Sequence, residues 1–223
     1  MKLIFHGHAF VEVITDVSIL IDPFITSNPL SDKPADSFSP DAILLTHGHF
    51  DHIEDAEAIS RRTGCPVYAI AELSKWFGKK GLDARGFNMG GTLRIKETSV
   101  RSVEAKHSSS TPDGAYAGVP CGFVISFDGK TIYHAGDTSL YSDMSLISDR
   151  YTLDAALLPI GGHYTMDLVD AAAAVSILKP RMVIPIHYKT FGPIKTNPVE
   201  FCNAIRFPET KCVILEPGEE LNI

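Results

Sequence analysis

His47-Gly48-His49-Phe50-Asp51-His52 places three of the nine histidines of this chain, together with one carboxylate, in six residues. The segment directly follows the apolar run 42–46, which predicts a buried strand that delivers these side chains to one point. Residues i and i+2 of an extended segment point to the same side, so His47 and His49 can bind one ion together. Asp51 and His52 follow where the chain turns, and they can reach a second ion nearby. Such ligands suit Zn²⁺, Mn²⁺, Fe²⁺ or Ni²⁺, whereas the alternative is a histidine-rich surface loop without a ligand.

Three further candidate ligands stand at the ends of apolar strands. His107 follows a run that ends at residue 105, Asp137 follows 132–136, and His187 follows 182–186. Ligands in layered α/β proteins gather at the carboxyl ends of strands. Each residue alone has an ordinary alternative, as a surface histidine or as a turn or helix-capping aspartate. Taken together they predict two sets joined by a bridging Asp137: His47, His49 and His107 around one ion, and Asp51, His52 and His187 around the other.

The composition is that of an ordinary globular chain. With 223 residues, 44% of them hydrophobic and 21% charged, we expect a single domain over residues 1–223 with a sizeable core. The net charge of −7 and the lack of a Lys/Arg block argue against binding to nucleic acid or to an anionic membrane. A small anionic substrate stays open, because a metal site carries its own positive charge. No apolar stretch approaches the length of a transmembrane helix.

The cysteines and the N-terminus bear on the cellular compartment. Cys65, Cys121, Cys202 and Cys212 are scattered and include no CxxC pair. Histidines at positions 6 and 8 interrupt the apolar core that a signal peptide would need. We therefore expect four reduced, mostly structural cysteines in a cytoplasmic protein.

Local patterns predict a β-rich first part followed by alternating strands and helices. An Asp-Gly step at 128–129 between two apolar runs predicts a hairpin. The segment 26–40, rich in Ser, Pro and Asp, is expected to be irregular, either a surface loop or an active-site lid. Without a linker, this order predicts two sheets packed face to face with helices outside. The expected strands are 3–5, 10–15, 17–21, 42–45, 66–70, 91–95, 98–105, 123–127, 131–134, 155–158, 182–186 and 211–215, and the expected helices are 54–62, 71–79, 167–178 and 198–206.

The candidate ligands and their neighbours resemble the metallo-β-lactamase superfamily. Shorter stretches, at 7–9, 20–24 and 158–162, are similar to a branch of metal-dependent hydrolases related to ascorbate-6-phosphate lactonase (the UlaG type) and, more distantly, to ribonuclease Z. The resemblance implies an α/β protein with an αββα four-layer sandwich and a metal site at one edge of the two sheets. It implies one or two divalent ions, with zinc or manganese first and iron or nickel also compatible. The segments that carry it are 46–52, His107-Ser108, 133–138 and His187-Tyr188.

The expected chemistry is hydrolysis. Two cations about 3.5–4 Å apart can share a water and lower its pKa towards 7, which gives a metal-activated hydroxide. That hydroxide would cleave a small ester, lactone or phosphodiester while the cations stabilise the developing negative charge. In this scheme Asp137 bridges the ions, and Asp51 binds one of them and orients the nucleophile. His163 stands where relatives are expected to carry an acidic or amide residue, and it could be a general acid, a substrate contact or a solvated side chain.

The sequence also supports expectations for five other residues near the candidate ligands. Asp22 could receive the second ring N–H of a ligand histidine, or it could only form an Asp-Pro turn. His8 could lie near the site as a supporting or substrate-contacting residue. His6 and His134 are expected to be hydrogen-bonded strand histidines. Lys189 is expected to be solvated rather than to meet a substrate phosphate.

Two other functions stay open from sequence. One is a nuclease of the ribonuclease Z kind, against which the acidic balance counts because phosphate contacts dominate nucleic-acid affinity. The other is a metal-binding or ligand-sensing protein without turnover. The expected partner is a small molecule, possibly anionic, with no membrane and no nucleic acid. A homo-oligomer is expected because symmetric homo-oligomers are common among soluble enzymes.

Overall fold

Fourteen strands form two seven-stranded sheets in the computed structural model, which describes residues 1–223. In spatial order the first sheet contains β14 (Glu220–Asn222), β1 (Lys2–Phe5), β2 (Val11–Ile14), β3 (Ser18–Ile21), β4 (Ala42–Leu44), β5 (Val67–Ile70) and β6 (Ala84–Phe87). The second sheet contains β13 (Lys211–Cys212), β12 (Met182–Ile186), β11 (Ala155–Pro159), β10 (Lys130–His134), β9 (Cys121–Phe127), β8 (Thr98–Glu104) and β7 (Thr92–Ile95).

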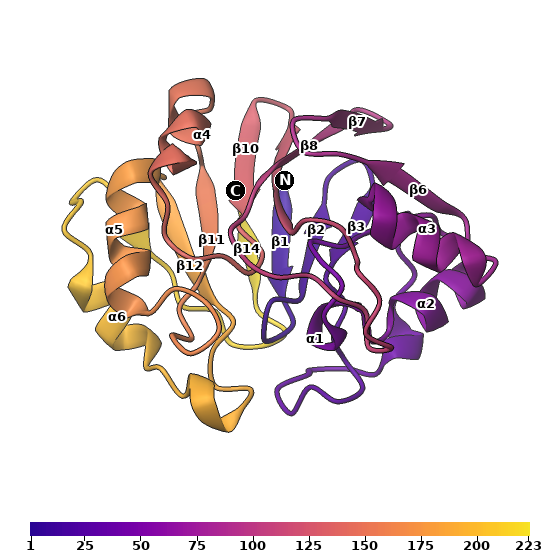
Figure 1. Ribbon diagram of the computed structural model, residues 1–223. Helices are drawn as coiled ribbons and strands as arrows, with labels where there is room; N and C mark the ends of the chain where they lie inside the picture. The colour runs from indigo at the N-terminus through magenta and orange to yellow at the C-terminus, as the bar shows by residue number, and fades with distance from the viewer.

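Apart from the single turn α1, which follows β4, the helices lie on the two outer sides of the sheets. They are α1 (Phe50–Ile53), α2 (Ala56–Thr63), α3 (Ala71–Lys79), α4 (Ser145–Arg150), α5 (Leu168–Leu178) and α6 (Pro198–Ala204). Three short 3₁₀ turns are η1 (Ala35–Ser37), η2 (Ser142–Met144) and η3 (Gly192–Ile194). Figure 1 shows α2 and α3 on one side and α4, α5 and α6 on the other. The predicted α/β class and αββα four-layer sandwich are therefore confirmed.

Three apolar layers hold the four layers of structure together. Because side chains alternate along a strand, Ile19 and Ile21 of β3 pack between the sheets while Leu20 packs towards the helices. The layer between the sheets joins these residues to Phe123 and Ile125 of β9. Separate buried clusters join the first sheet to α2 and α3, and the second sheet to α4, α5 and α6.

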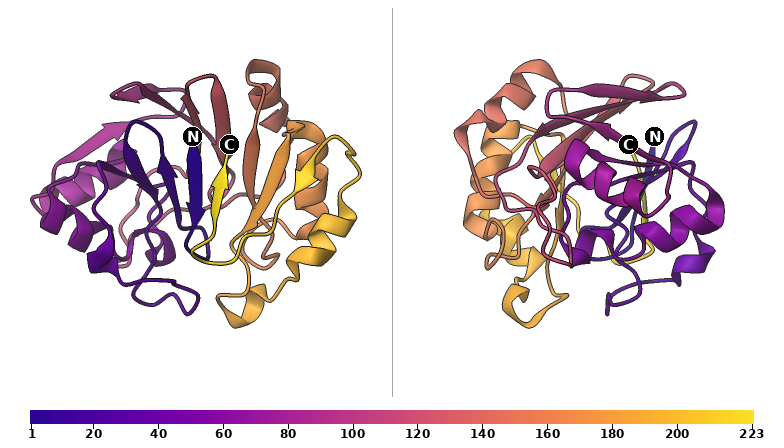
Figure 2. Two further views of the ribbon diagram at one scale, coloured as in Figure 1. Left: turned by 180° about the vertical axis from the view of Figure 1, so that it is seen from behind. Right: turned by 45° about the vertical axis from the view of Figure 1, so that its right-hand side comes forward.

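The ends of the chain meet in the first sheet. Strand β1 pairs antiparallel with β14, with Leu3 opposite Leu221. Figure 2 shows from behind that the two termini lie side by side. None of the helices has the length and apolar character needed to cross a membrane.

Strand direction brings distant segments to one edge of the sandwich. Strands β3, β4 and β5 run parallel to one another, as do β10, β11 and β12 in the other sheet. Their carboxyl ends therefore meet at a common edge of each sheet. His47, Asp137 and His187 follow β4, β10 and β12 in sequence. His107 follows β8, which points the same way as β10 because both pair antiparallel with β9, so the topology brings these residues together.

Several short elements differ from the sequence expectations. Residues 50–53 form a helical turn, α1, so that the following helix begins only at Ala56. Strand β6 and helix α4 were not expected, because β6 has a mostly exposed edge-strand pattern and α4 is only six residues long. The strand predicted at 211–215 is shorter and ends at Cys212. These elements form through tertiary pairing, and they lack the long periodic pattern that sequence reasoning requires.

The segment 26–40 is fastened to the first sheet and its helices. The carboxylate of Asp55 accepts hydrogen bonds from the Ile25 and Thr26 amides at 2.7 and 3.0 Å. Asp32 lies 2.7 Å from a ring nitrogen of the buried His6. None of this segment lines the principal cavity described below. The structure therefore favours the surface-loop interpretation over the lid.

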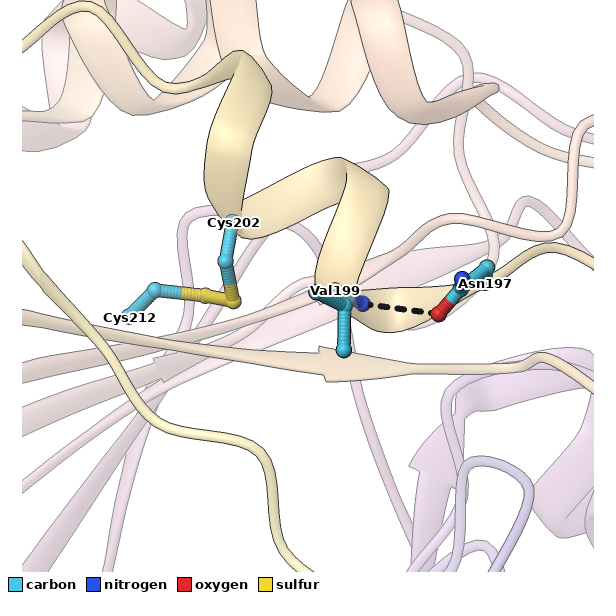
Figure 3. Close-up of a disulfide and its surroundings, with 4 residues drawn as sticks. All are labelled: Asn197, Val199, Cys202 and Cys212. Atoms are coloured by element: carbon cyan, nitrogen blue, oxygen red, sulfur yellow. Dashed lines mark hydrogen bonds between the residues drawn. A yellow bond between two sulfur atoms is a disulfide. The ribbon is translucent and has the colours of Figure 1, made fainter.

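The prediction of four reduced cysteines is wrong for two of them. Cys202 of α6 and Cys212 of β13 form a disulfide, with their Cα atoms 5.5 Å apart (Figure 3). The ten-residue spacing gave no signal, because pairing depends on how the chain reverses after α6 and disulfide connectivity cannot be deduced from spacing alone. Cys65 and Cys121 are free and buried, as expected. Cysteine usage consequently gives no support for a reducing compartment.

Candidate metal centre

Titratable side chains from six strand ends converge at one edge of the sandwich. Three of them, His8 after β1, Asp22 after β3 and His187 after β12, have φ angles of 58°, 52° and 57°. This left-handed conformation is uncommon for residues with a side chain, and it persists only where the surroundings hold it in place. Each strand thus turns sharply at the point where it presents a polar side chain to the site.

Asp137, directly after β10, lies at the middle of the cluster. Its Oδ2 atom is 3.1 Å from Nε2 of His187, 3.5 Å from Nε2 of His107 and 3.9 Å from Nε2 of His47. Its Oδ1 atom is 3.4 Å from Nε2 of His52. One buried carboxylate therefore faces imidazoles that come from three different segments of the chain.

The first predicted set of ligands is brought together. Nε2 of His47 lies 3.0 Å from Nδ1 of His49. With His107 they form a group in which one ligand atom from each residue lies within 4.8 Å of the others. Two nitrogens bound to one tetrahedral zinc stand about 3.4 Å apart, given Zn–N bonds of about 2.0–2.1 Å, so the spacing suits a shared cation.

The second predicted set is also brought together, and it gains a fourth member. Asp51, His52 and His187 form a group with His8 within the same 4.8 Å limit. Nε2 of His8 lies 3.2 Å from Oδ2 of Asp51, while the opposite ring nitrogen lies 2.8 Å from the hydroxyl of Thr190. His8 is completely buried, so these contacts fix its ring.

Buried atoms without a partner test whether these residues fit a metal. Nε2 of His52, Nε2 of His187 and Oδ1 of Asp137 are buried and make no hydrogen bond within the protein. Buried polar atoms in folded proteins are nearly always paired, so a concentration of unpaired ones in one cluster points to a ligand. All three belong to residues whose donor atoms face one another. The donor set of imidazoles and carboxylates fits divalent transition metals.

Asp22 supports the cluster from behind. Its Oδ2 atom lies 2.8 Å from Nδ1 of His52 and accepts the Thr46 hydroxyl at 2.6 Å. Its other oxygen accepts the Thr46 amide at 2.8 Å. A carboxylate that receives the outer ring N–H of a histidine fixes its tautomer and aims the inner nitrogen at the site. The interpretation of Asp22 as the partner of a ligand histidine agrees with this geometry.

Burial and mutual proximity set the charge states in the metal-free protein. Burial is the largest influence on His47, His49 and His107, and it lowers the pKa of each. Burial also opposes charge on His52, but Asp137 and Asp22 more than offset it and raise the pKa of this imidazole. Three of these four histidines are thus held neutral, which is the form that binds a metal.

The carboxylates are held ionised. Burial alone would raise the pKa of Asp137, but the adjacent His187 and His52 lower it well below the usual value. Burial also opposes ionisation of Asp51. The hydrogen bond from His8 and the nearby His52 outweigh this effect of burial, so the pKa of this carboxyl is lowered as well. The pKa of His8 itself falls to about 3, because the ring is desolvated and lies beside His187. Asp51 therefore accepts a hydrogen bond from a neutral His8.

Two glycines permit this close assembly. A Cβ atom at Gly48 would stand 2.5 Å from Cβ of Ala117, and one at Gly136 would stand 2.9 Å from Cβ of Thr46. Gly136 also has a φ of 60°. A larger residue at either position would have to displace these neighbouring atoms.

A cavity of about 610 Å³ opens onto the cluster. Five candidate ligands form its floor: His49, Asp51, His107, Asp137 and His187. Its walls are formed by Phe50, Ser108, Ser110, Thr111, Pro112, Tyr164 and Phe191.

Other histidines and a lysine lie away from the cavity. His163 is exposed and does not line it, although its neighbour Tyr164 does. The catalytic role of His163 stays a prediction without a contact to support it. His134 is buried, with its ring bonded to the Ala9 carbonyl at 2.9 Å, as expected for a strand histidine. Lys189 is exposed, as expected, and does not line the cavity.

Sequence reasoning gave too little weight to three residues at the site. His8 follows β1 just as the other ligands follow their strands, so the strand-end rule could have identified it. Thr190 follows the candidate ligand His187, but its contact to His8 gave no signal, because it joins residues 182 positions apart. Phe191 carried none either, since an aromatic residue on a loop does not by itself indicate a cavity wall.

Comparisons with known proteins agree with this geometry. A model of the beta-lactamase superfamily domain matches residues 18–188. A UPF0173 metal-dependent hydrolase of Thermoplasma volcanium is 47% identical over 223 residues, covering 100% of this chain and 99% of the relative. A second UPF0173 metal-dependent hydrolase, from Pyrococcus furiosus, is 46% identical over 228 residues, and the match covers 100% of both chains.

A solved structure gives the same result. Igni18, described as a novel metallo hydrolase from the hyperthermophilic archaeon Ignicoccus hospitalis KIN4/I, is 41% identical and superposes with a TM-score of 0.90. The match covers 99% of this chain and 97% of the other. The superfamily expected from sequence is confirmed, whereas the relation to ascorbate-6-phosphate lactonase stays a prediction. The chain belongs to the beta-lactamase superfamily, among the UPF0173 metal-dependent hydrolases.

Proposed function

We propose that this protein is a hydrolase that binds two divalent cations and cleaves a small ester, lactone or phosphodiester. The observation that carries the proposal is the position of Asp137, with four imidazole nitrogens within 3.9 Å of its two oxygens. A carboxylate so placed suits the bridge between two cations. Zinc or manganese is proposed first, because the donor set mixes imidazole nitrogen with carboxylate oxygen.

Each cation would have its own set of side chains. His47, His49 and His107 would hold one, and Asp51, His52 and His187 would hold the other. Asp22 supports the second set through its hydrogen bond to His52. When bound, such a pair supplies Lewis acidity to the reacting centre and lowers the pKa of water.

Asp51 is proposed to orient the attacking water. Its side chain lines the cavity, and its ionised carboxylate is a hydrogen-bond acceptor. Because an ionised carboxylate only accepts, Nε2 of the neutral His8 donates to it and Nδ1 accepts from Thr190. The chain Thr190–His8–Asp51 thereby holds Oδ2 of Asp51 in place and leaves Oδ1 without a partner inside the protein.

A nuclease is the weaker alternative. Phosphate contacts from Lys and Arg supply most of the affinity for nucleic acids, and the walls of this cavity contain neither residue. The net charge of −7 adds repulsion towards a polyanion. A small-molecule substrate therefore fits the site better.

Assembly and location are proposed on less direct support. Exposed apolar side chains on the outer helices, at Leu146 and Val199, would suit contacts between copies in a homo-oligomer. Light scattering coupled to gel filtration would give the number of copies.

The cytoplasm stays the proposed location, and fractionation of cells that produce the tagged protein would test it.

The decisive experiment measures metal content and turnover together. Purified protein, loaded with Zn²⁺ or Mn²⁺, is assayed with 4-nitrophenyl esters, lactones and bis(4-nitrophenyl) phosphate. We expect metal-dependent turnover that falls at least 10³-fold in His49→Ala and Asp137→Ala, about the cost of losing one principal source of electrostatic stabilisation. Val169→Ala, an exposed position on α5, is the control for both variants and should keep full activity. Unchanged rates in the two ligand variants would refute catalysis by this cluster, and no metal-dependent rate in the unmodified protein would leave a metal-binding protein without turnover.

A further inference from the structure

The walls of the cavity carry no cationic side chain. Among the twelve residues that line it, those outside the ligand set are aromatic, hydroxylic or proline, and none is Lys or Arg. The substrate's reacting group can face the ligand cluster, but the rest of the substrate must lie against these walls. Their chemistry therefore indicates what the rest of the substrate is.

One wall is aromatic and is built from three separate segments. The ring of Phe50 lies 5.6 Å from that of Phe24 and 6.2 Å from that of Phe191, centroid to centroid. Phe24 is completely buried beneath them, whereas Phe50 is 46% exposed. A large ring exposed at a cavity and supported by a buried ring is a preformed apolar surface for a ligand.

The nearest lysines in sequence turn away from the cavity. Nζ of Lys106, beside the ligand His107, lies 5.3 Å from the centre of the Tyr141 ring. Nζ of Lys189 lies 5.8 Å from the centre of the Tyr188 ring. Neither lysine lines the cavity. A phosphate or sulfonate held against these walls would lose its hydration without gaining a charged partner, which is costly.

Other lining residues offer neutral hydrogen-bonding groups. Ser108 and Ser110 line the cavity, and their hydroxyls make no hydrogen bond to another protein group. The hydroxyl of Thr111, by contrast, is engaged by Asp113 and by the Ala115 carbonyl. Two free hydroxyls can donate to or accept from uncharged oxygens of a ligand.

We infer that the substrates are uncharged carboxylic esters or lactones that carry an aryl or similarly bulky apolar group next to the scissile bond. The inference rests on the proposed hydrolase function and narrows it. In the reaction, a bond forms between water oxygen and the acyl carbon, and the bond from that carbon to the alcohol oxygen breaks. A carboxylate and an alcohol result, and one proton is released to solvent. Phosphorylated substrates, which resemblance to the lactonase would suggest, do not fit the walls.

Binding of unreactive probes to the zinc-loaded protein tests the inference apart from turnover. Acetanilide is the neutral aryl probe, 4-acetamidobenzenesulfonate adds a charge that is a poor zinc ligand, and N-methylacetamide lacks the ring. By titration followed with NMR, we expect acetanilide to bind at least tenfold more tightly than either of the others. Equal or tighter binding of the sulfonate, or equal binding of N-methylacetamide, would overturn the inference.

Variants of the walls sharpen the binding test. Phe50→Ala should weaken acetanilide binding about fivefold, because it removes apolar contact area. Ser110→Arg should place a cation in the cavity and raise the affinity for the sulfonate at least fivefold. Val169→Ala is the control and should change neither affinity. If both wall variants behave like the control, the cavity is not where the aryl group binds, and the inference fails.

Kinetics separate this inference from the function on which it rests. With the metal-loaded enzyme, 4-nitrophenyl benzoate should have a kcat/KM at least tenfold above that of 4-nitrophenyl 4-sulfobenzoate, each corrected for its uncatalysed rate. Metal-dependent turnover that favours the sulfonated ester would overturn the substrate class and leave the hydrolase intact. Absence of any metal-dependent turnover would refute the hydrolase. The binding experiment would still show whether the cavity prefers a neutral aryl group.

Discussion

Two completely buried histidines, His6 and His8, lie two residues apart and have different surroundings. His6 packs between Phe10 and Phe38, at centroid distances of 4.7 and 4.9 Å, and bonds to Asp32 on the surface loop. His8 lies 4.1 Å from the ring of the candidate ligand His187. The first histidine holds a loop against the sheet, and the second lies within the candidate metal centre.

The difference between them comes from the turn at Gly7. Gly7 has a φ of 92°, and His8 after it has a φ of 58°, so the chain leaves the direction of β1 before it reaches His8. The His8 carbonyl then accepts the amide of His187 at 2.7 Å. Backbone pairing between the ends of β1 and β12 therefore places His8 in the centre and leaves His6 outside it. Residue type alone does not distinguish the two.

Acid should have the largest effect on the metal-free protein, and it acts through the metal centre. The pKa values of His8, His47, His49 and His107 are lowered, mainly by burial, so these groups take up protons on unfolding. Their contribution to stability is complete above about pH 6.5, the unfolded value, and it is lost as the pH falls below that. The raised pKa of His52 has the opposite sign, but its contribution is already complete below pH 6.5 and does not offset the loss.

Urea unfolding of the chelator-treated protein at pH 7, 6 and 5 measures this effect. The free energy of unfolding should fall by about 1.4 kcal/mol per pH unit for each net proton taken up. His8→Phe removes one of the four groups and should make the slope shallower. A free energy of unfolding that is unchanged or higher at pH 5 would show that the buried histidines are not held neutral.

A matched pair of aspartates gives the next largest contrast. Asp22 lies 2.8 Å from Nδ1 of His52, and Asp32 lies 2.7 Å from Nδ1 of His6. Asp22→Asn should weaken metal binding or activity by about 10–100-fold, the usual effect of losing the partner of a ligand histidine. Asp32→Asn, with the same change of charge, should leave both unchanged and only lower stability. Competition with a zinc chelator gives the metal affinities. Equal losses of metal affinity in the two variants would show that Asp22 supports the site no more than Asp32 does.

Much of the candidate metal centre follows a local rule that is visible in the sequence. His107, Asp137 and His187 follow the ends of β8, β10 and β12, and these strands point in the same direction, which brings their ends to one edge. The αββα arrangement was accessible for a related reason, since strand and helix periods are visible in short windows of sequence. What could be predicted was therefore carried by local patterns repeated along the chain.

What could not be predicted depends on contacts between distant segments. The Cys202–Cys212 disulfide, the bond between His8 and Thr190, and the aromatic wall that includes Phe191 all form only after the chain has folded. Short edge elements such as β6 form for the same reason. For His8 and Phe191 no local window contains the partner, and for the two cysteines, ten residues apart, spacing alone does not fix the pairing.

The smallest predicted effect on catalysis compares the same substitution at the two histidines. His8→Phe removes the hydrogen bond to Asp51, and kcat should fall about tenfold, since a hydrogen bond to a charged group contributes about 1.5 kcal/mol. His8→Gln, whose amide can take the place of the donating nitrogen, should recover part of this loss. His6→Phe should leave kcat unchanged and lower only the urea midpoint. If His8→Phe keeps its metal and its full kcat, then His8, like His6, serves the fold alone, and Asp51 needs no help to hold its position.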